Sequence, residues 1–550
     1  MSSARLASPL LLLALFACPL PPGVDAGARP DAGSVDGGAS DAGRVADAGS
    51  AEDSGLVLDS GVVDSGVIDS GVVDGGPIGA CTPTSGSLPT PAVTRVGRFE
   101  RVSSFPMGEA LLDRDLRVYL PASYDSEPSR RYPVLYLHDG QNLFDASEAA
   151  FGVEWQVDET VDALVAAGRI PEVIVVGIDN TAERIRDYTP DVDPAYPDSG
   201  AGDLYLDALV GRIKPWIESR YRVRCGREHT AVAGSSLGGL ISFRAMERHG
   251  DVIGRFGCLS SSFWWNTQSA LSRYQSSSPP TPLRLWLDGG SEEDALDATG
   301  LSGRIADNRA VLARALALGL VYGDSVALLE DPGAAHDEAA WAARLPSVLG
   351  YLLSDEVFTP QSATGISVVT WSKRIDSGAR GAFSVELSHG GTRLSWPVAT
   401  SDISLSLSPA GVVTHSSAGL LSGVGEGGAL VIASVGALAG SDVVQVGAPG
   451  ETTIGFEVTA PTAPGGVYVG GSAPGLGAWQ PDGLLLEQGA DGRWRGVAQL
   501  PRDTSYEYKY TRGTWQTVEK GAAGEEVANR TGFAAEPLVH RDEVASFAAP

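Results

Sequence analysis

The chain has 550 residues, which is too long for a single hydrophobic core and corresponds to about three domains. Its 68 Asp and Glu residues outnumber 40 Lys and Arg, giving a formal net charge of −28. Such a balance offers little to neutralise nucleic-acid phosphates, so we exclude a nucleic-acid partner.

Residues 1–18 are typical of a lipoprotein-type signal peptide. Arg5 supplies a positive charge, and residues 6–17 form an apolar stretch too short to span a bilayer. Cys18 then ends a sequence similar to a bacterial lipobox, although Phe16 stands where a smaller residue is usual. We expect export and a lipid anchor as the only membrane contact, at the outer membrane or cell surface. Ordinary signal-peptidase cleavage and secretion is the alternative.

Residues 19–91 are expected to form a disordered linker. Residues 18–80 contain 10 Asp and 1 Glu against 2 Arg, and an Asp-Ser-Gly-Val-Val repeat runs from Asp59 towards Asp74. This composition cannot bury a core, and its like charges repel, so the segment is predicted to be an extended tether. Calcium binding by the regularly spaced aspartates is the alternative.

Residues 92–356 alternate strand-like and helix-like runs, which predicts an α/β fold with a mostly parallel sheet and helices on both faces. We expect strands at 116–120, 133–137, 173–178, 230–233, 256–260, 283–287 and 325–329, and helices near 155–167, 204–221, 237–249, 305–318 and 337–353.

Ser236 stands at the centre of Gly234-Ser235-Ser236-Leu237-Gly238, the G-x-S-x-G pattern of a nucleophile elbow. An apolar run precedes the motif and a helix-like run follows it. The strained turn needs small residues beside the serine, because strand and helix backbones approach closely there. We therefore predict that Ser236 is a catalytic nucleophile.

A serine nucleophile needs a histidine base and a carboxylate, which follow in the order Ser, acid, His in this fold. Two histidines come after Ser236 before the β-rich region, His249 and His336. His249 ends the helix that begins at the elbow and should point away from the site. His336 lies in a loop between a strand and a helix, where catalytic groups are typical, so we predict that it is the base.

The residues alone do not identify the catalytic acid or the second oxyanion donor. Four carboxylates, Asp288, Glu292, Glu293 and Asp294, stand at the end of the strand at 283–287. Glu293 and Asp294 are far enough along to reach His336, whereas Asp288 is close enough to belong to the strand itself. The backbone N–H of Leu237 is expected to be one oxyanion donor, and the other should come from the loop at 135–145.

Five motifs show that residues 92–356 resemble the Putative esterase family of α/β-hydrolases, which includes carbohydrate esterase family 1, siderophore esterases, S-formylglutathione hydrolases and the antigen 85 mycolyltransferases. These motifs are His138-Asp139-Gly140-Gln141-Asn142-Leu143-Phe144-Asp145, Arg186-Asp187-Tyr188-Thr189-Pro190, Gly234-Ser235-Ser236-Leu237-Gly238-Gly239, Ser262-Phe263-Trp264-Trp265 and His336-Asp337-Glu338-Ala339-Ala340-Trp341.

The resemblance implies Glu293 as the acid and the Gln141 N–H as the second oxyanion donor. Trp264 and Trp265 have two possible interpretations: they either line the acyl pocket or pack under a neighbouring loop.

Cys81, Cys225 and Cys258 remain after the lipobox cysteine. In an exported protein an odd number allows at most one bridge among them. A bridge between Cys225 and Cys258 and two independent buried thiols are the alternatives that we consider.

The C-terminal region, after Pro360, predicts two all-β sandwich modules. Residues 362–448 loosely resemble a bacterial immunoglobulin-like domain and are described most safely as a β spacer. Further along are Leu476-Gly477-Ala478-Trp479, Tyr506-Glu507-Tyr508-Lys509-Tyr510 and Trp515. With these runs, residues 451–548 resemble a starch-binding domain of carbohydrate-binding module family 20. The resemblance implies one sugar site made by Trp479, Trp515 and Lys509, while Trp494 either belongs to a second site or lies in the core.

The sequence therefore predicts an exported serine carboxylesterase that acts on acylated carbohydrate and binds starch or a related α-glucan. We expect no metal and no organic cofactor. The alternatives are a siderophore esterase, with the C-terminal modules serving adhesion, and a non-catalytic glucan-binding surface protein.

Overall fold

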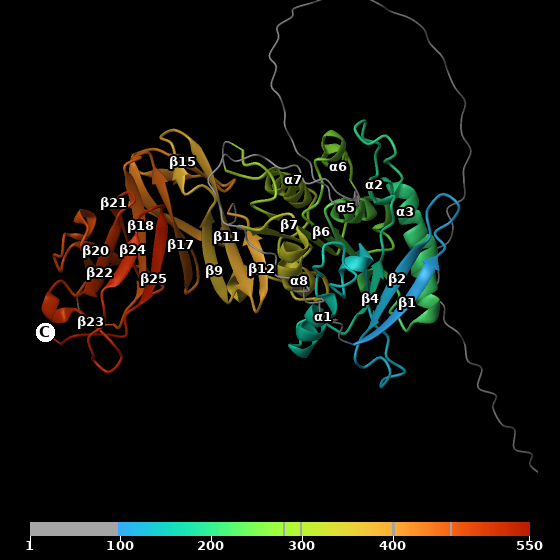
Figure 1. Cartoon of the computed structure of the whole chain (residues 1–550), viewed down its shortest axis with the longest axis horizontal. Coiled ribbons are helices and arrows are strands. Elements are labelled where there is room, and N and C mark those ends of the chain that lie inside the picture. The colour runs from blue at the N-terminus through green and yellow to red at the C-terminus, as the bar shows by residue number, and fades with distance from the viewer. Residues whose placement is uncertain (1–96, 279–280, 298–299, 399–401, 463–464, 550) are drawn as a thin grey trace, which may run out of the picture.

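The computed structural model describes residues 97–549, apart from 279–280, 298–299, 399–401 and 463–464. Three parts follow one another in space in chain order, with the α/β part at one end and the starch-binding-like part at the other (Figure 1). The expected signal peptide, the linker and Cys81 lie outside the described residues. Among the helices in the described ranges, none combines the length and apolar character needed to cross a membrane.

An eight-stranded sheet forms the centre of the α/β part, in the order β1-β2-β4-β3-β5-β6-β7-β8. Strands β3 to β8 pair in parallel, while β1 and β2 join antiparallel at one edge. The expected mostly parallel α/β fold is confirmed. The strands are β1 (Arg98–Phe105), β2 (Arg114–Leu120), β3 (Val134–His138), β4 (Ile174–Ile178), β5 (Thr230–Ser235), β6 (Arg255–Leu259), β7 (Arg284–Gly290) and β8 (Val326–Asp331).

The helices gather in two layers around this sheet: α1 packs on α8, while α2 and α3 pack on α5 (Figure 1). They are α1 (Val157–Ala166), α2 (Arg184–Tyr188), α3 (Gly202–Ala208), α4 (Lys214–Arg220), α5 (Leu237–His249), α6 (Trp265–Ser276), α7 (Gly303–Ala317) and α8 (Glu338–Leu352).

Four elements differ from the prediction, and one of them is the short helix α2, which was not expected. The helix expected at 204–221 is α3 and α4 joined by a π-helical turn over Leu209–Ile213. Strand β1 was not predicted, because it is an edge strand with half of its residues exposed and with no alternation of apolar residues. Helix α6 was not predicted either, since its Ser- and Gln-containing sequence has little helical periodicity.

The middle part, which we call the β module, is built from two antiparallel-rich sheets. One has the order β10-β17-β16-β13, and the other has β12-β11-β15-β14 with β9 also paired to β11. Its strands are β9 (Gly365–Thr370), β10 (Arg374–Ile375), β11 (Arg380–His389), β12 (Thr392–Trp396), β13 (Ser404–Ser408), β14 (Val413–His415), β15 (Leu420–Gly423), β16 (Gly427–Val435) and β17 (Leu438–Val446).

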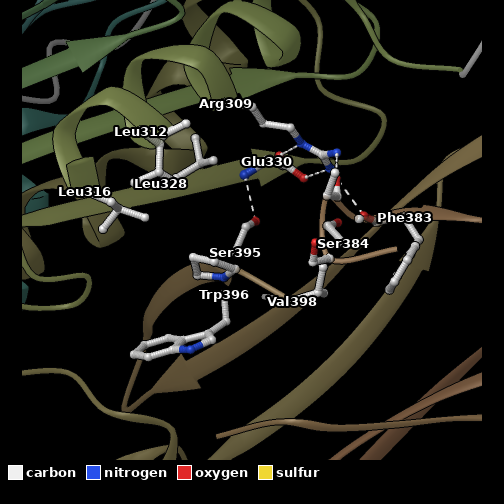
Figure 2. Close-up of a pocket in the computed structure, with 15 residues that line it drawn as sticks. Arg309, Leu312, Leu316, Leu328, Glu330, Phe383, Ser384, Ser395, Trp396 and Val398 are labelled. Carbon is white, nitrogen blue, oxygen red and sulfur yellow. Dashed lines mark hydrogen bonds and ion pairs between the residues drawn. The ribbon is translucent and has the colours of Figure 1, made fainter. Parts of the chain in front are cut away.

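The β module packs directly on the α/β part, where β12 lies against β8 and α8. A single cluster of buried apolar residues runs through both parts and includes Leu328 of β8 and Trp396 of β12. A cavity of about 250 Å³ lies in this contact, lined mainly by apolar groups of α7, β8, β11 and β12 (Figure 2). The two parts therefore share a core.

The C-terminal part has a separate apolar cluster around Phe456 and Tyr508. Its main sheet has the order β24-β22-β19-β20-β21-β18-β25. The strands are β18 (Glu451–Thr459), β19 (Val467–Gly471), β20 (Leu484–Gln488), β21 (Trp494–Pro501), β22 (Ser505–Thr511), β23 (Glu519–Lys520), β24 (Arg530–Phe533), β25 (Leu538–Glu543) and β26 (Ser546–Phe547).

Both expectations for Cys225 and Cys258 are wrong. Cys225 is disulfide-bonded, whereas Cys258 is a free, buried thiol, and burial raises its pKa well above the usual value. Cys258 lies opposite Gly234 near the carboxyl end of β5, while Cys225 precedes the amino end of that strand. The length of β5 separates the two cysteines beyond the reach of a disulfide.

Candidate active site

Ser236 lies at the turn between β5 and α5, the strand–turn–helix arrangement expected for a nucleophile elbow. Its backbone has φ 58° and ψ −121°, a conformation that a non-glycine residue adopts only under strain. A Cβ atom on Gly234 would lie 2.9 Å from the carbonyl carbon of Gly238, and one on Gly239 would lie 2.4 Å from the Ser261 hydroxyl. The glycines are required because the strand and helix backbones meet here.

His336 connects Ser236 to Glu293. The Nε2 atom of His336 lies 3.0 Å from Ser236 Oγ, and its Nδ1 atom lies 3.0 Å from Glu293 Oε2. Both are hydrogen-bond distances, so the Ser–His–acid row has the geometry for proton transfer from the hydroxyl to the imidazole. The ring of Trp341 packs edge-on against the imidazole, with ring centroids 5.0 Å apart, and restricts its rotation.

Glu293 is buried within a network of donors that the sequence did not indicate. Its Oε1 atom accepts hydrogen bonds from the Gly290 N–H and the Ser260 hydroxyl, both at 2.6 Å. Arg304 Nε lies 3.1 Å from Oε2, and Arg344 Nη2 lies 3.4 Å from Oε1. Burial by itself would raise the pKa of Glu293, but the hydrogen bond to His336 and the charges of His336, Arg304 and Arg344 hold it below the usual value. Glu293 is therefore the ionised partner of His336.

The other two candidate acids have different surroundings. Asp288 is buried and accepts hydrogen bonds from the Ser260 N–H at 3.0 Å and from Trp286 Nε1 at 2.7 Å. Burial raises the pKa of Asp288 to about 6, against the opposing charge of Arg344. Asp294 is partly exposed and accepts a hydrogen bond from the Arg304 N–H at 3.1 Å.

The two expected oxyanion donors lie at the starts of helical turns. Leu237 begins α5, and Gln141 lies in a 3-10 turn over Gly140–Asn142. Among the described residues, neither backbone N–H donates a hydrogen bond to a protein acceptor. Asp139, with φ 58°, sets the course of the loop, and Arg184 holds its carboxylate at 2.8 and 3.0 Å. Both amides thus remain available to an incoming oxyanion.

Other residues around the elbow have structural roles. Trp265 is buried and donates a hydrogen bond to the Asp191 carbonyl at 2.9 Å, so it packs under a neighbouring loop, while Trp264 is half-buried beside it. His249 pairs with Asp207 at 3.0 Å at the far end of α5. His138 is buried against the Tyr205 hydroxyl, and burial lowers its pKa to about 3.

In the C-terminal part, the two tryptophans expected to bind sugar lie side by side. Trp479 and Trp515 are 37% and 38% exposed, and their ring centroids are 6.2 Å apart at an interplanar angle of 48°. The Lys509 ammonium donates a hydrogen bond to the Val527 carbonyl. Trp494 is half-buried and packs against the apolar cluster, so the core interpretation holds for that residue.

Within the described ranges, no group of three or more His, Cys, Asp or Glu side chains is placed to hold a metal ion.

The sheet, the elbow and the Ser–His–Glu row define a serine hydrolase of the α/β-hydrolase class. The chain belongs to the family described as "Putative esterase", which its residues 111–352 match, and residues 451–531 match the family described as "Starch binding domain". It is therefore an esterase with a starch-binding module.

The relatives cover different shares of the chain. The uncharacterized protein YbbA of Bacillus subtilis is 30% identical over 186 residues, 33% of this chain and 69% of YbbA. An iron(III) salmochelin esterase of Escherichia coli is 27% identical over 195 residues, 33% of this chain and 43% of that protein. An alpha-amylase of Niallia circulans is 35% identical over 97 residues, 17% of this chain and 7% of that protein. The chain thus spans less than half of the two named enzymes.

Among solved structures, a ferulic acid esterase is similar with a TM-score of 0.37 at 20% identity. The match covers 46% of this chain and 98% of that one.

Proposed function

We propose that this esterase removes acyl groups from ester-substituted carbohydrate through an acyl-enzyme formed on Ser236. The observation that carries the proposal is the row Ser236 Oγ, His336 and Glu293, joined by two hydrogen-bond distances of 3.0 Å. In this row His336 Nε2 takes the hydroxyl proton while Ser236 Oγ attacks the ester carbonyl carbon. The negative charge on Glu293 stabilises the imidazolium that results.

The Gln141 and Leu237 N–H groups are proposed to hold the negatively charged carbonyl oxygen of the tetrahedral intermediate. When that intermediate collapses, the alcohol leaves with the proton from His336, and the acyl group stays on Ser236. A water molecule then gives its proton to His336 and attacks the acyl carbon, and collapse of the second intermediate returns the proton to Ser236 Oγ. The carboxylic acid is released, and no cofactor takes part.

Support for a carbohydrate substrate comes from the starch-binding module, because an α-glucan held by Trp479 and Trp515 would raise the local concentration of esters attached to it. The test is a panel of p-nitrophenyl esters from acetyl to butyryl, feruloyl esters, acetylated starch and a triscatecholate siderophore ester. We expect turnover of the acetylated starch. Preferential hydrolysis of the siderophore ester would favour the siderophore-esterase alternative, and a lack of activity throughout would favour a non-catalytic binding protein.

Loss of either sugar-stacking tryptophan is expected to weaken glucan binding without lowering the stability of the C-terminal part. In a fragment of residues 451–548 expressed alone, Trp479→Ala or Trp515→Ala should weaken β-cyclodextrin binding about tenfold. The reason is that removal of one ring takes roughly 1.5 kcal/mol of stacking from the complex. The melting temperature should change little, since both rings are more than one-third exposed. A core tryptophan would instead cost about 3–5 kcal/mol of stability.

Affinity electrophoresis in starch gels and a thermal melt separate these cases, with the half-buried Trp494→Ala as the destabilised control. An unretarded wild-type fragment would contradict glucan binding. A collapsed melting temperature in both variants would show that the rings are structural.

We also propose that the protein is exported and anchored through a lipid on Cys18, supported by Arg5, the apolar residues 6–17 and the lipobox-like sequence. In bacteria that express the full chain, labelled palmitate should enter the wild type, and Cys18→Ser should abolish the label and release the protein from the membrane fraction. An unlabelled wild-type protein in the medium would favour secretion.

A further inference from the structure

The strand that leads to His336 is held by residues of the β module. Strand β8 ends at Asp331, whose Oδ1 atom accepts a hydrogen bond from Arg393 Nη2 of β12 at 2.9 Å. One residue earlier, the Glu330 N–H donates to the Ser395 hydroxyl at 2.8 Å (Figure 2). Glu386 of β11 fixes Arg393 in turn, with distances of 2.8 and 3.1 Å. Arg393 and Ser395 of β12 thus hold the end of β8 through hydrogen bonds.

Asp331 also faces the network around the catalytic acid. Its Oδ2 atom lies 3.8 Å from Arg344 Nη1, and Arg344 Nη2 lies 3.4 Å from Glu293 Oε1. Charges therefore alternate from Arg393 through Asp331 and Arg344 to Glu293. Arg344 and Glu293 have fully buried side chains and Asp331 is nearly buried, so water screens the interactions of Arg344 poorly, while Arg393 is 35% exposed and its ion pair with Asp331 is screened more.

Close contacts with residues 290–292 restrain the loop between Asp331 and His336. The Gly333 N–H donates to the Ser291 hydroxyl at 2.7 Å, and the Glu292 N–H donates to the Ala334 carbonyl at 3.0 Å. A Cβ atom on Gly290 would lie 2.1 Å from the Ala334 carbonyl oxygen. A displacement of Asp331 is therefore passed along the loop to His336 and to the loop that carries Glu293.

A second contact joins the β module to α7, the helix that carries Arg304. Arg309 forms a two-pronged ion pair with Glu330 at 2.6 and 2.9 Å, and its remaining N–H groups donate to the carbonyls of Phe383 and Ala418 (Figure 2). The module thus contacts two elements that supply groups to the active site.

We propose that Arg393 is a positioning residue for His336, so that the β module is part of the ester-hydrolysing unit and not a spacer. The proposal rests on the role of Ser236, His336 and Glu293 proposed above. The hydrogen bonds of the Arg393 side chain go to Asp331 and Glu386, so in this proposal it acts on His336 through Asp331. A shift of well under 1 Å in a catalytic base lowers the rate of proton transfer while leaving substrate binding nearly unchanged.

The test compares Arg393→Met with Arg374→Met in the full chain. Arg374 lies in the same module but binds Glu536, Thr452 and the Glu451 carbonyl on the C-terminal side, so it is a matched control. On p-nitrophenyl acetate, Arg393→Met is expected to lower kcat about tenfold with KM changed less than twofold. Arg374→Met should stay within twofold of wild type for both constants. Arg393→Lys, which keeps the charge beside Asp331, should recover part of the loss.

A second measurement does not depend on turnover. The Nδ1 proton between His336 and Glu293 is expected to give a downfield proton resonance, identified by its loss in His336→Gln. Arg393→Met should shift or broaden this resonance, and Arg374→Met should not. Should Arg393→Met fail to fold, Ser395→Ala removes the neighbouring contact and is expected to lower kcat about threefold with a similar change in the resonance.

Equal kcat values and unchanged resonances in the Arg393 and Arg374 variants would overturn the proposal. A wild-type protein that hydrolyses no ester, but whose resonance still changes in Arg393→Met, would instead refute the proposed function and support the positioning contact.

Discussion

Ser236→Ala is expected to reduce ester hydrolysis by about a thousandfold or more while leaving the fold intact. The substitution removes only the Oγ atom that lies 3.0 Å from His336 Nε2, so no nucleophile remains to form the acyl-enzyme. Alanine fits the elbow because the turn excludes larger groups at Gly234 and Gly239 and not at the serine itself. The measurement is the steady-state rate on p-nitrophenyl acetate, together with a thermal melt.

Ser235→Ala is the matched control, because this serine belongs to the same motif and is also buried, but ends β5 one residue before the nucleophile. It should retain activity within about threefold of wild type. Wild-type activity in purified Ser236→Ala would show that the nucleophile is another residue.

Glu293→Gln is expected to lower kcat by about a thousandfold. The amide keeps the shape of the side chain but loses the charge that stabilises the His336 imidazolium, and it can present its NH₂ group to Nδ1 and favour the wrong tautomer. Because the hydrogen bond to His336 and the nearby positive charges hold the pKa of Glu293 below its usual value, the wild-type carboxylate is charged at neutral pH and loses this role only as the pH falls through that lowered pKa.

The two nearby aspartates provide the comparison for Glu293→Gln. Asp294→Asn should change kcat less than about threefold, since Asp294 is partly exposed and keeps an oxygen for the Arg304 N–H. Asp288→Asn should mainly lower stability, by about 1–3 kcal/mol, because it leaves Arg344 with one charged partner fewer. A large loss of activity in Asp294→Asn with none in Glu293→Gln would show that Asp294 is the catalytic acid.

Local patterns in the sequence were sufficient for much of the fold and for two residues of the row, Ser236 and His336. The G-x-S-x-G motif lies within five consecutive residues, so its strand–turn–helix geometry follows from local preferences. His336 could be chosen because only two histidines follow Ser236 in the α/β region. Glu293 needed the family resemblance, because three carboxylates crowd the same loop and the sequence carries no sign of which one turns inward.

The sequence alone thus determined the strand–turn–helix elbow at Ser236, the α/β class and the presence of a starch-binding module. Tertiary structure alone decided what surrounds the acid, since Ser260, Arg304 and Arg344 come from separate segments that folding brings together. It also decided that Cys225 does not pair with Cys258, and that Arg393 of the β module holds Asp331 beside the catalytic loop. The reason is physical: periodicity and turn chemistry act over a few residues, whereas these contacts depend on how whole sheets and helices pack.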